Sequence, residues 1–410
     1  MTLVLLVTST IMAPSTEATG DEWEIQCSDS PSGTTNYLFG VAAHADDAVV
    51  AVGSKYVSGN HKPLAELWEP TEEQTPCFVE KSTPSVSGHS ELNAVTRVPS
   101  ASPQRHFWAV GYQGGSSRTW NADIGDWTIA GATTLIERST DGGETWSIVS
   151  SPNPSGATSS VLRGVSARAS NDVWAVGHYT TSTGQFTLIQ HWNGSAWSIV
   201  SSPNESGVEN YLRGVSALED DYAWAVGFTH DVSAGETFSK ILRWNGTSWS
   251  AVSHPQPGED FNQLGAVTAI SEDQAHAVGT YFPETGAKDT EAQYWDGEDW
   301  TVETTPSPED GANVLLGVAP VSDNDIWAVG SAEDPPHKTL TARRVNGTWS
   351  QVTSPNASNY NNQLFAVAVV PGTNICAGGY IWAVGYYDYS NTGTPKTLAM
   401  RYYITPGCNL

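Results

Sequence analysis

The sequence predicts an all-β protein, a seven-bladed β-propeller of four-stranded antiparallel sheets. Three observations lead to this prediction: the composition, an apolar Val-Gly step that recurs seven times, and four strand-like segments in each repeat. The chain has 410 residues with 17 Trp, 15 Tyr, 9 Phe, 38 Gly and 23 Pro, and no long stretch has helical periodicity. Such a composition is typical of an all-β fold with many turns.

The Val-Gly step marks the second strand of each repeat. Consecutive steps are 50 to 66 residues apart, a spacing that suits a four-stranded sheet with its connections. The steps end at Gly53, Gly111, Gly177, Gly227, Gly279, Gly330 and Gly385. A single four-stranded sheet cannot bury both faces, whereas sheets packed radially around an axis cover one another. The repeats therefore predict a ring.

Residues 160–203 show the elements of one repeat in order. LRGVSA is the first strand, VWAVGHY the second, TLIQHW the third and AWSIVSSP the fourth. A small residue in the first strand allows close approach near the axis, and the Trp of the second strand fills the wider space between sheets. Asn-Gly or Asp-Gly before the fourth strand predicts a type I′ turn, which needs positive φ at both central residues. These pairs are Asn193-Gly194, Asn245-Gly246, Asp296-Gly297 and Asn346-Gly347.

The last repeat has only three strands, and its fourth is expected at the other end of the chain. The repeat stops at TLAMRYY, whereas DEWEIQC near the N-terminus resembles the final strand of the other repeats. We expect this N-terminal strand to complete the last blade and close the ring, because closure removes free sheet edges. The expected single domain spans 19–410, with closing strand 22–27 and blades 36–84, 89–152, 160–203, 210–255, 262–306, 314–355 and 363–403.

The chain is expected to be exported. Residues 1–18 resemble a signal peptide, with an apolar run and then small residues, although a basic start is absent. No other segment is apolar and long enough to insert into a membrane, so we expect a secreted or cell-surface protein. The formal charge of −26 disfavours nucleic acid as a partner, because an acidic surface repels phosphates.

Four cysteines in a chain expected to be exported predict two disulfides. Cys27 lies on the closing strand, Cys77 in the first sheet, Cys376 in an enlarged turn of the last repeat and Cys408 at the C-terminus. The first and last sheets are neighbours in the predicted ring, so all four cysteines flank one seam. Of the three possible pairings, we predict Cys27–Cys408 and Cys77–Cys376.

Residues 139–146, Ser-Thr-Asp-Gly-Gly-Glu-Thr-Trp, resemble an Asp-box (BNR) motif of sialidase-like and related bacterial propellers. The repeat pattern over residues 21–403 is similar to repeat arrays in secreted bacterial proteins. This resemblance implies the propeller architecture. It implies no catalytic role for the motif, because Asp-boxes usually lie away from active sites in such families. Sialidase activity is not implied either, since the early Arg-Ile-Pro of sialidases is absent.

The candidate ligand site lies on the face where the long loops before the first strand and after the second strand meet. Arg163 and Arg213 share one position in consecutive repeats, and Tyr179, Phe228 and Tyr281 follow the Val-Gly steps. An arginine pair with aromatic rings could hold an acidic sugar. In the structural alternative, the arginines pair with acidic residues and the rings pack between sheets. The matching positions in the other repeats hold Phe39, Asn93, Gly265, Leu316 and Phe365.

No catalytic, metal or cofactor signature stands out in the sequence. There is no His-Glu-x-x-His, Gly-x-Ser-x-Gly or phosphate-binding loop. His276 occupies a position where other repeats have Trp, and we expect a core histidine there. The acidic turns lack the spacing of a calcium loop. We therefore expect no metal and no cofactor.

Two functions are consistent with these observations. The first is a non-catalytic exported binding or structural module, whose partner is a surface glycan, a matrix component or extracellular protein, or identical subunits in a homo-oligomer. The alternative is a polysaccharide-active enzyme, a glycoside hydrolase or lyase, with its site at the channel mouth. The missing catalytic signature favours the binding or structural module.

Overall fold

The computed structural model describes most of the chain, and every regular element in the described part is a strand. Those residues accordingly include no helix long and apolar enough to cross a membrane. The signal peptide expected at residues 1–18 lies outside the described residues. The described ranges are 21–30, 35–45, 48–69, 76–99, 105–219, 221–284, 286–308, 311–332, 336–374, 376–390 and 393–407.

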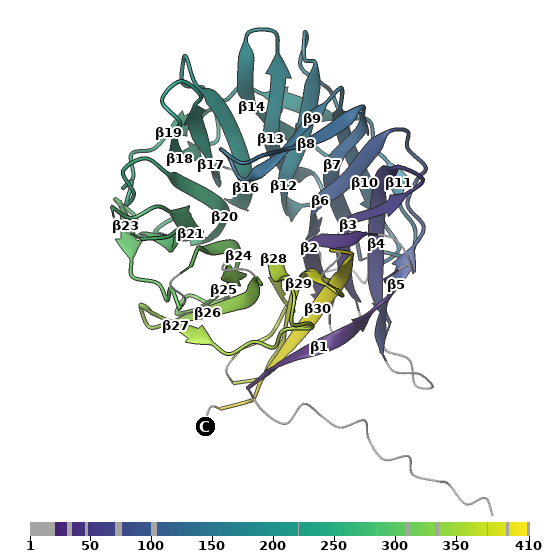
Figure 1. Ribbon diagram of the computed structural model, residues 1–410, viewed down its shortest axis with the longest axis vertical. Coiled ribbons are helices and arrows are strands. Elements are labelled where there is room, and N and C mark those ends of the chain that lie inside the picture. Colours follow the sequence, from purple (N-terminus) through teal and green to yellow (C-terminus); the bar gives the residue numbers. More distant parts are fainter. Residues whose placement is uncertain are drawn as a thin grey trace, which may run out of the picture.

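Most strands belong to four-stranded antiparallel sheets that stand around a common axis (Figure 1). These sheets contain β6 (His89–Arg97), β7 (Phe107–Gly115), β10 (Thr133–Ser139) and β11 (Ser147–Ile148); β12 (Ser159–Ala169), β13 (Asp172–Thr181), β14 (Gly184–Trp192) and β15 (Trp197–Val200); β16 (Glu209–Glu219), β17 (Tyr222–Asp231), β18 (Glu236–Trp244) and β19 (Trp249–Ala251); β20 (Asn262–Ser271), β21 (Gln274–Tyr281), β22 (Asp289–Trp295) and β23 (Trp300–Glu303); β24 (Asn313–Ser322), β25 (Asp325–Ala332), β26 (Lys338–Val345) and β27 (Thr348–Val352). A separate two-stranded hairpin, β8 (Ser117–Asn121) and β9 (Asp126–Ala130), is inserted between β7 and β10.

The two ends of the chain meet in one eight-stranded sheet, in the order β2-β3-β4-β5-β1-β30-β29-β28. Its strands are β1 (Trp23–Ser28), β2 (Asn36–Ala45), β3 (Ala48–Val57), β4 (Asn60–Glu69), β5 (Cys77–Lys81), β28 (Asn362–Val369), β29 (Gly379–Asp388) and β30 (Pro395–Ile404). As expected for a closing strand, β1 pairs antiparallel with β30. It also continues past β30 and pairs parallel with β5, so that Cys27 lies opposite Cys77.

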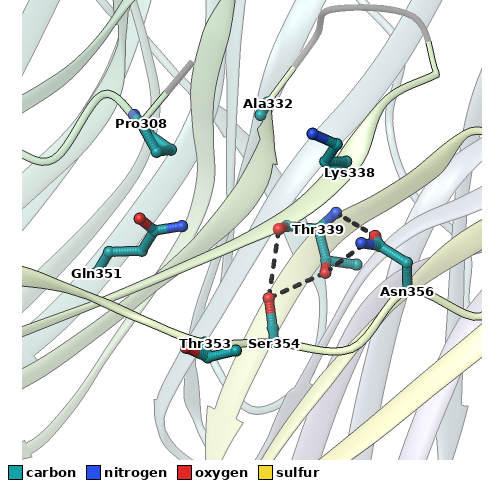
Figure 2. A pocket seen from close by; sticks show the side chains of 8 residues that line it. All are labelled: Pro308, Ala332, Lys338, Thr339, Gln351, Thr353, Ser354 and Asn356. Carbon is teal, nitrogen blue, oxygen red and sulfur yellow. Dashed lines mark hydrogen bonds between the residues drawn. The ribbon is translucent and has the colours of Figure 1, made fainter.

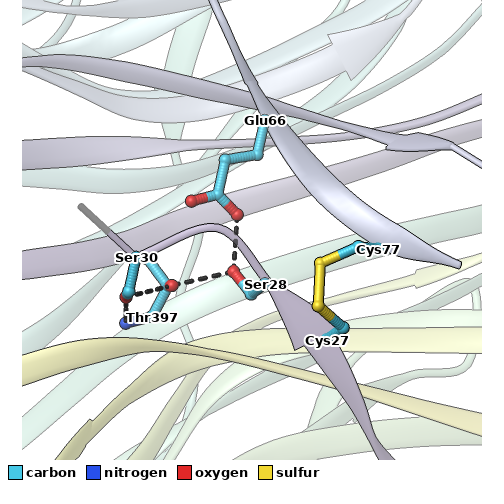
Figure 3. The surroundings of a disulfide bond; sticks show 6 residues. All are labelled: Cys27, Ser28, Ser30, Glu66, Cys77 and Thr397. Carbon is cyan, nitrogen blue, oxygen red and sulfur yellow. Dashed lines mark hydrogen bonds between the residues drawn. A yellow bond between two sulfur atoms is a disulfide. The ribbon is translucent and has the colours of Figure 1, made fainter. Parts of the chain in front are cut away.

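The predicted disulfide pairing is wrong. Cys27 is bonded to Cys77, with their Cα atoms 4.5 Å apart, and this bond excludes both Cys27–Cys408 and Cys77–Cys376 (Figure 3). All four cysteines were expected where the first and last sheets meet, and the register of β1 against β5, which sets Cys27 opposite Cys77, decides the pairing. Cys376 is also disulfide-bonded, and Cys408 lies outside the described residues.

Hydrogen bonds also connect β1 to both halves of the eight-stranded sheet. The Ser28 hydroxyl lies 2.6 Å from the Glu66 carboxylate on β4 and 2.7 Å from the Thr397 hydroxyl on β30 (Figure 3). One side chain of β1 therefore contacts both halves of the eight-stranded sheet. Burial raises the pKa of Glu66 well above its ordinary value, although the Ser28 hydrogen bond acts in the opposite direction.

Tryptophans on the second strands fill the space between sheets. Each packs against rings on the outer strands of the next sheet, as Trp108 does against Trp192 and Trp197 at 5.0 and 5.4 Å. Trp23 of β1 takes the corresponding place against Trp327 at 5.7 Å, so β1 serves as the outer strand of the last sheet. The second-strand tryptophans, at most 3 % exposed, are Trp108, Trp174, Trp224, Trp327 and Trp382.

The first strands lie innermost and contact one another in ring order: β2, β6, β12, β16, β20, β24, β28 and again β2 (Figure 1). Their small residues are required by close backbone approach. A Cβ on Gly164 would lie 2.6 Å from the Arg213 carbonyl oxygen, and one on Gly317 would lie 3.0 Å from Ala366 Cα. The expectation that these glycines allow tight packing near the axis is therefore confirmed.

The prediction of type I′ turns is confirmed at one place and wrong at three. Asn346 and Gly347, with φ of 50° and 85°, form a two-residue connection. Asn193, Asn245 and Asp296 instead open four-residue connections in which Gly alone has positive φ. Their side-chain oxygens accept backbone N–H groups within the turn, an arrangement that the two extra residues make possible.

Removing the Cys27–Cys77 disulfide is expected to destabilise the protein. Replacement of Cys27 and Cys77 by Ala opens a cross-link between residues 50 positions apart, which corresponds to about 4 kcal/mol in the chain-entropy model. Chemical denaturation of the wild type and the double variant measures this loss. Non-reducing peptide mapping is the control for connectivity, and recovery of a Cys27–Cys408 peptide would contradict the structure.

A buried carboxyl on β10 predicts a pH-dependent stability. Burial raises the pKa of Glu137 from 4.5 to about 8, and neither carboxyl oxygen has a hydrogen-bond partner among the described residues. In the next sheet, Gln190 occupies the equivalent place opposite Ala175 and donates to the Pro152 carbonyl at 2.9 Å. The stabilising contribution of protonated Glu137 is complete below pH 4.5 and is lost as the pH rises toward 8.

We therefore expect Glu137→Gln to stabilise the protein increasingly between pH 4.5 and 8, by up to about 4 kcal/mol. The reverse change, Gln190→Glu, is the matched control and should destabilise the protein over the same interval. Free energies of unfolding measured at several pH values test both. A difference between Glu137→Gln and wild type that does not vary with pH would show that Glu137 is ionised in the folded protein.

Candidate functional site

Each innermost strand contains a β-bulge in its N-terminal half, which follows a long loop. The bulged residues are Phe39, Asn93, Arg163, Arg213, Gly265, Leu316 and Phe365. A bulge redirects its side chain from the regular alternation of the strand. The ring axis is therefore bordered by residues of different chemistry, with two arginines on consecutive strands and an aromatic pair, Phe39 and Phe365, whose rings are 5.3 Å apart.

Arg163 and Arg213 converge on one carboxylate, that of Asp126 on the β8–β9 hairpin. Their Nη2 atoms lie 2.9 and 3.4 Å from the same oxygen, Asp126 Oδ2. Arg163 Nη2 also donates to the Trp127 carbonyl at 3.3 Å, while the Trp127 N–H donates to Asp126 Oδ1 at 2.7 Å. The arginines thus pair with an acidic residue, as the structural alternative predicted, and that residue comes from an inserted hairpin.

The arginine site carries a surplus of positive charge. Burial alone would raise the pKa of Asp126, but the charges of Arg163 and Arg213 outweigh it and lower this pKa. Burial, together with both arginines, lowers the pKa of the neighbouring His178 to about 3, so this histidine is neutral. Among the described residues, Asp126 is the only carboxylate within 4.0 Å of either guanidinium. Two positive charges therefore face one negative charge.

The hairpin is anchored at its base by a second buried charge pair. Arg118 Nη2 lies 3.2 Å from Glu91 Oε1, and Glu91 is 2 % exposed. Arg118 Nη1 also lies 3.0 Å from His61 Nε2, and burial with the Arg118 charge lowers the pKa of His61 to about 3. A neutral His61 can accept a hydrogen bond from Arg118, so the guanidinium is held by two partners.

The far end of the hairpin reaches other sheets. Ile124 is buried against Tyr211 and Phe228, on β16 and β17, and its carbonyl accepts a hydrogen bond from Gln263 on β20 at 3.0 Å. Nearer its base, Ile129 packs against Tyr112 and Val161. The hairpin therefore lies across the long-loop ends of several innermost strands (Figure 1).

The structure brings together three of the five predicted site residues. Phe228 lies beside the arginines, with the Arg213 guanidinium carbon 5.1 Å from its ring centre. Tyr179 instead packs against Phe186 at 5.4 Å, and Tyr281 lies opposite Asp289 across β21 and β22. Neither tyrosine makes a described contact with the arginines. Phe228 is the first residue after its Val-Gly step, whereas Tyr179 and Tyr281 are the second, and successive residues of a strand face opposite sides of the sheet.

The β8–β9 hairpin that defines the site is not among the elements predicted from the sequence. A signal was present, because the spacing of 66 residues between Gly111 and Gly177 is the longest in the chain and leaves room for an insertion. The partner of the arginines could not be read from that spacing. Asp126 belongs to the preceding repeat unit and reaches Arg163 and Arg213 only because the hairpin folds over the next two sheets.

Exposed aromatic residues gather on the long-loop face. They lie on the hairpin, at the ends of second strands or before a first strand, all of which are at the same end of the antiparallel sheets. The exposed fractions are 53 % for Trp120, 41 % for Tyr56, 40 % for Phe282, 40 % for Tyr360 and 72 % for Tyr389. Of these residues, Trp120 belongs to the hairpin that holds Asp126, whereas the other four belong to the first, fifth and last repeats.

A pocket of about 210 Å³ lies elsewhere, beside β26 and β27 (Figure 2). Three of its polar residues bond to one another: Asn356 Oδ1 accepts from Thr339 N at 2.8 Å, and Thr339 Oγ1 lies 2.9 Å from Ser354 Oγ. Thr187 and Asn204 repeat the same N–H to amide oxygen bond at 2.8 Å in another sheet. The pocket therefore arises from a recurring loop connection.

Two other sequence features have structural explanations. His276 is fully buried, burial lowers its pKa to about 3, and its ring packs against Tyr294 at 5.1 Å. In the turn 139–146, Asp141 accepts hydrogen bonds from Ser139 Oγ and from Thr145 N, so its carboxylate is used within the turn. In the described part of the chain, no three His, Cys, Asp or Glu side chains are grouped as a metal site would require.

Comparisons with known proteins identify the fold. No protein-family model and no curated protein sequence matches the chain. YCF48 bound to a D1 peptide is similar in structure, with a TM-score of 0.53, 13 % identity and coverage of 96 % of this chain and 98 % of the other. A PL25 ulvan lyase bound to -[GlcA(1-4)Rha3S]- has a TM-score of 0.53 and 10 % identity over 92 % and 93 %.

A second PL25 ulvan lyase structure has a TM-score of 0.53, 11 % identity and coverage of 87 % and 90 %. All these neighbours are propeller-like, and the radial sheets described above agree with them. The chain is therefore a β-propeller. At such low identities the likeness extends to the fold alone.

Replacing Asp126 is expected to release the hairpin. Asp126→Ala leaves two partly buried guanidiniums without their carboxylate, a loss on the order of 3–5 kcal/mol. Hydrogen exchange of residues 117–130 should become faster, and this increase should be larger than any increase in β12 and β16. Asp123→Ala, which changes an exposed acid of the same hairpin, is the matched control and should leave exchange unchanged. Equal exchange in the two variants would mean that Asp126 does not hold the hairpin.

Proposed function

We propose that this protein is an exported, non-catalytic binding module that holds an acidic glycan on the long-loop face of a seven-bladed propeller. The ligand carboxylate is bound at Arg163 and Arg213, and an exposed aromatic ring of the β8–β9 hairpin contacts the sugar. The observation that carries this proposal is the charge imbalance at the arginine site, where two guanidiniums share the single carboxylate of Asp126. A second carboxylate, supplied by a ligand, would neutralise the remaining charge.

The distribution of charge favours binding of an acidic glycan at one specific site over non-specific attraction to the protein surface. The chain as a whole has a formal charge of −26, so a polyanion is repelled by most of its surface. The arginine site is a local exception. The Arg163 and Arg213 side chains are 14 % and 21 % exposed, and the buried Arg213 Nη2 has no hydrogen-bond partner in the described part of the chain. An acidic glycan that binds despite the overall repulsion would therefore bind at this site.

The seven-blade count is supported by seven sequence repeats and by the organisation of the eight-stranded sheet. The parallel pair of β1 and β5 divides that sheet into β2–β5 and β28–β30 with β1, each with four strands. An exported location is supported by the Cys27–Cys77 disulfide, because such bonds persist in oxidising compartments.

The comparisons are compatible with a polymeric partner. One propeller-like neighbour is bound to a peptide, and another, a polysaccharide lyase, is bound to a polymer that contains glucuronic acid. The second candidate function is accordingly a lyase or glycoside hydrolase. Such an enzyme needs a general acid or base that reaches its substrate, whereas His178, beside the arginine site, and His61, at the base of the hairpin, are only 7 % and 8 % exposed.

Arg213→Gln provides a direct test of the arginine site. This change removes the surplus positive charge but leaves Asp126 paired with Arg163 at 2.9 Å. We expect retention on polygalacturonate or a glucuronic-acid polymer to weaken by about tenfold or more, and wild-type retention to fall as salt increases. Affinity electrophoresis and co-sedimentation, with a neutral glucan alongside, measure the effect.

Arg343→Gln is the matched control, because Arg343 pairs with Asp325 at the opposite end of the sheets. Its retention should equal that of wild type. Wild-type protein that is retained on no acidic polymer would overturn the proposed function. New sugar ends in the same tubes would establish the enzymatic alternative.

A further inference from the structure

Trp120, on the inserted hairpin, is unusually exposed for a residue of its size. It is 53 % exposed, whereas the second-strand tryptophans are at most 3 % exposed. Its cross-strand partner Trp127 already has the Arg118 guanidinium 4.0 Å from its ring centre. Trp120 and Trp127 meet edge to face, with ring centres 5.4 Å apart. Trp120 thus keeps much of its indole surface open to solvent.

The same hairpin connects Trp120 to the arginine site through one residue. Trp127, which contacts the Trp120 ring, accepts a hydrogen bond from Arg163 Nη2 at its carbonyl. Asp126, adjacent to Trp127 in sequence, contacts both arginines. Trp127 therefore contacts the indole of Trp120 through its ring and the Arg163 guanidinium through its backbone carbonyl.

The hairpin presents Trp120 on a fixed support. Arg118 is held by Glu91, Ile129 is 5 % exposed in a cluster with Tyr112 and Val161, and Ile124 is 1 % exposed at the other end. Anchors on both sides of Trp120 limit the movement of the strand that carries it. A rigid platform next to a charged site is the arrangement that binding sites require.

We propose that Trp120 forms a stacking subsite for the sugar next to a uronic acid whose carboxylate is held by Arg163 and Arg213. The apolar C–H face of a sugar ring packs on the indole, and the carboxylate fixes the register of the chain. The ligand class is a polysaccharide with uronic acid residues. This subsite rests on the proposed function and adds the residue that would select a polymer over a small carboxylate.

The test uses a hexamer of galacturonic acid and titration calorimetry on the full chain. Trp120→Ala should weaken binding about tenfold, and Trp120→Phe, which keeps a ring, should weaken it less than Trp120→Ala. Tyr389→Ala is the matched control, since Tyr389 is 72 % exposed on the loop between β29 and β30. It should bind as wild type does. Circular dichroism establishes that each variant is folded, and an exposed position makes that outcome expected.

The outcomes separate the subsite from the proposed function. If Trp120→Ala binds the hexamer as tightly as wild type while Arg213→Gln does not, the stacking subsite is wrong and the arginine site stands. If Tyr389→Ala weakens binding as much as Trp120→Ala, the loss is not specific to the hairpin and the subsite is also wrong. If wild type does not bind the hexamer or a longer acidic polymer, both proposals are overturned.

Discussion

Closure of the ring by β1 is the constraint on which the rest of the molecule depends. A four-stranded sheet has two faces to cover, and in a ring each sheet covers its neighbours only if the first and last sheets meet. Here β1 pairs with β30 on one side and β5 on the other, and its Trp23 packs against Trp327. The Cys27–Cys77 bond then makes this non-covalent junction a covalent one. The innermost strands can hold side chains in fixed positions because that ring is complete.

The features that recur from repeat to repeat form the scaffold, and positions that differ between repeats form the candidate site. The second-strand tryptophans and the first-strand glycines recur because every sheet must pack on the next in the same way. The bulged positions do not contact the core in a uniform way, so they vary between Phe, Asn, Arg, Gly and Leu. Arg163 and Arg213 are the charged members of this set, and the inserted hairpin supplies Asp126 to them.

Buried charges at the hairpin are balanced in two different ways. At its base, Arg118 is held by Glu91 and by a neutral His61, so the positive charge is matched. Beneath Asp126, two guanidiniums share one carboxylate, and neutral His178 adds no further charge. Removing charges from water is costly unless each is paired. The first arrangement is therefore a structural anchor, whereas the second leaves a charge that a ligand can neutralise.

The sequence by itself determined the all-β class, the repeated four-strand unit, the pairing of the N-terminal strand with the last sheet and the shared position of Arg163 and Arg213. These follow from periodicity, turn residues and spacing, which are local properties of the chain. The tertiary structure alone decided that Cys27 bonds to Cys77, that Asp126 joins the two arginines, and that Tyr179 and Tyr281 lie apart from them. Each of these depends on how a strand or hairpin of one sheet is placed against another. Sequence spacing does not encode that placement when every repeat offers similar neighbours.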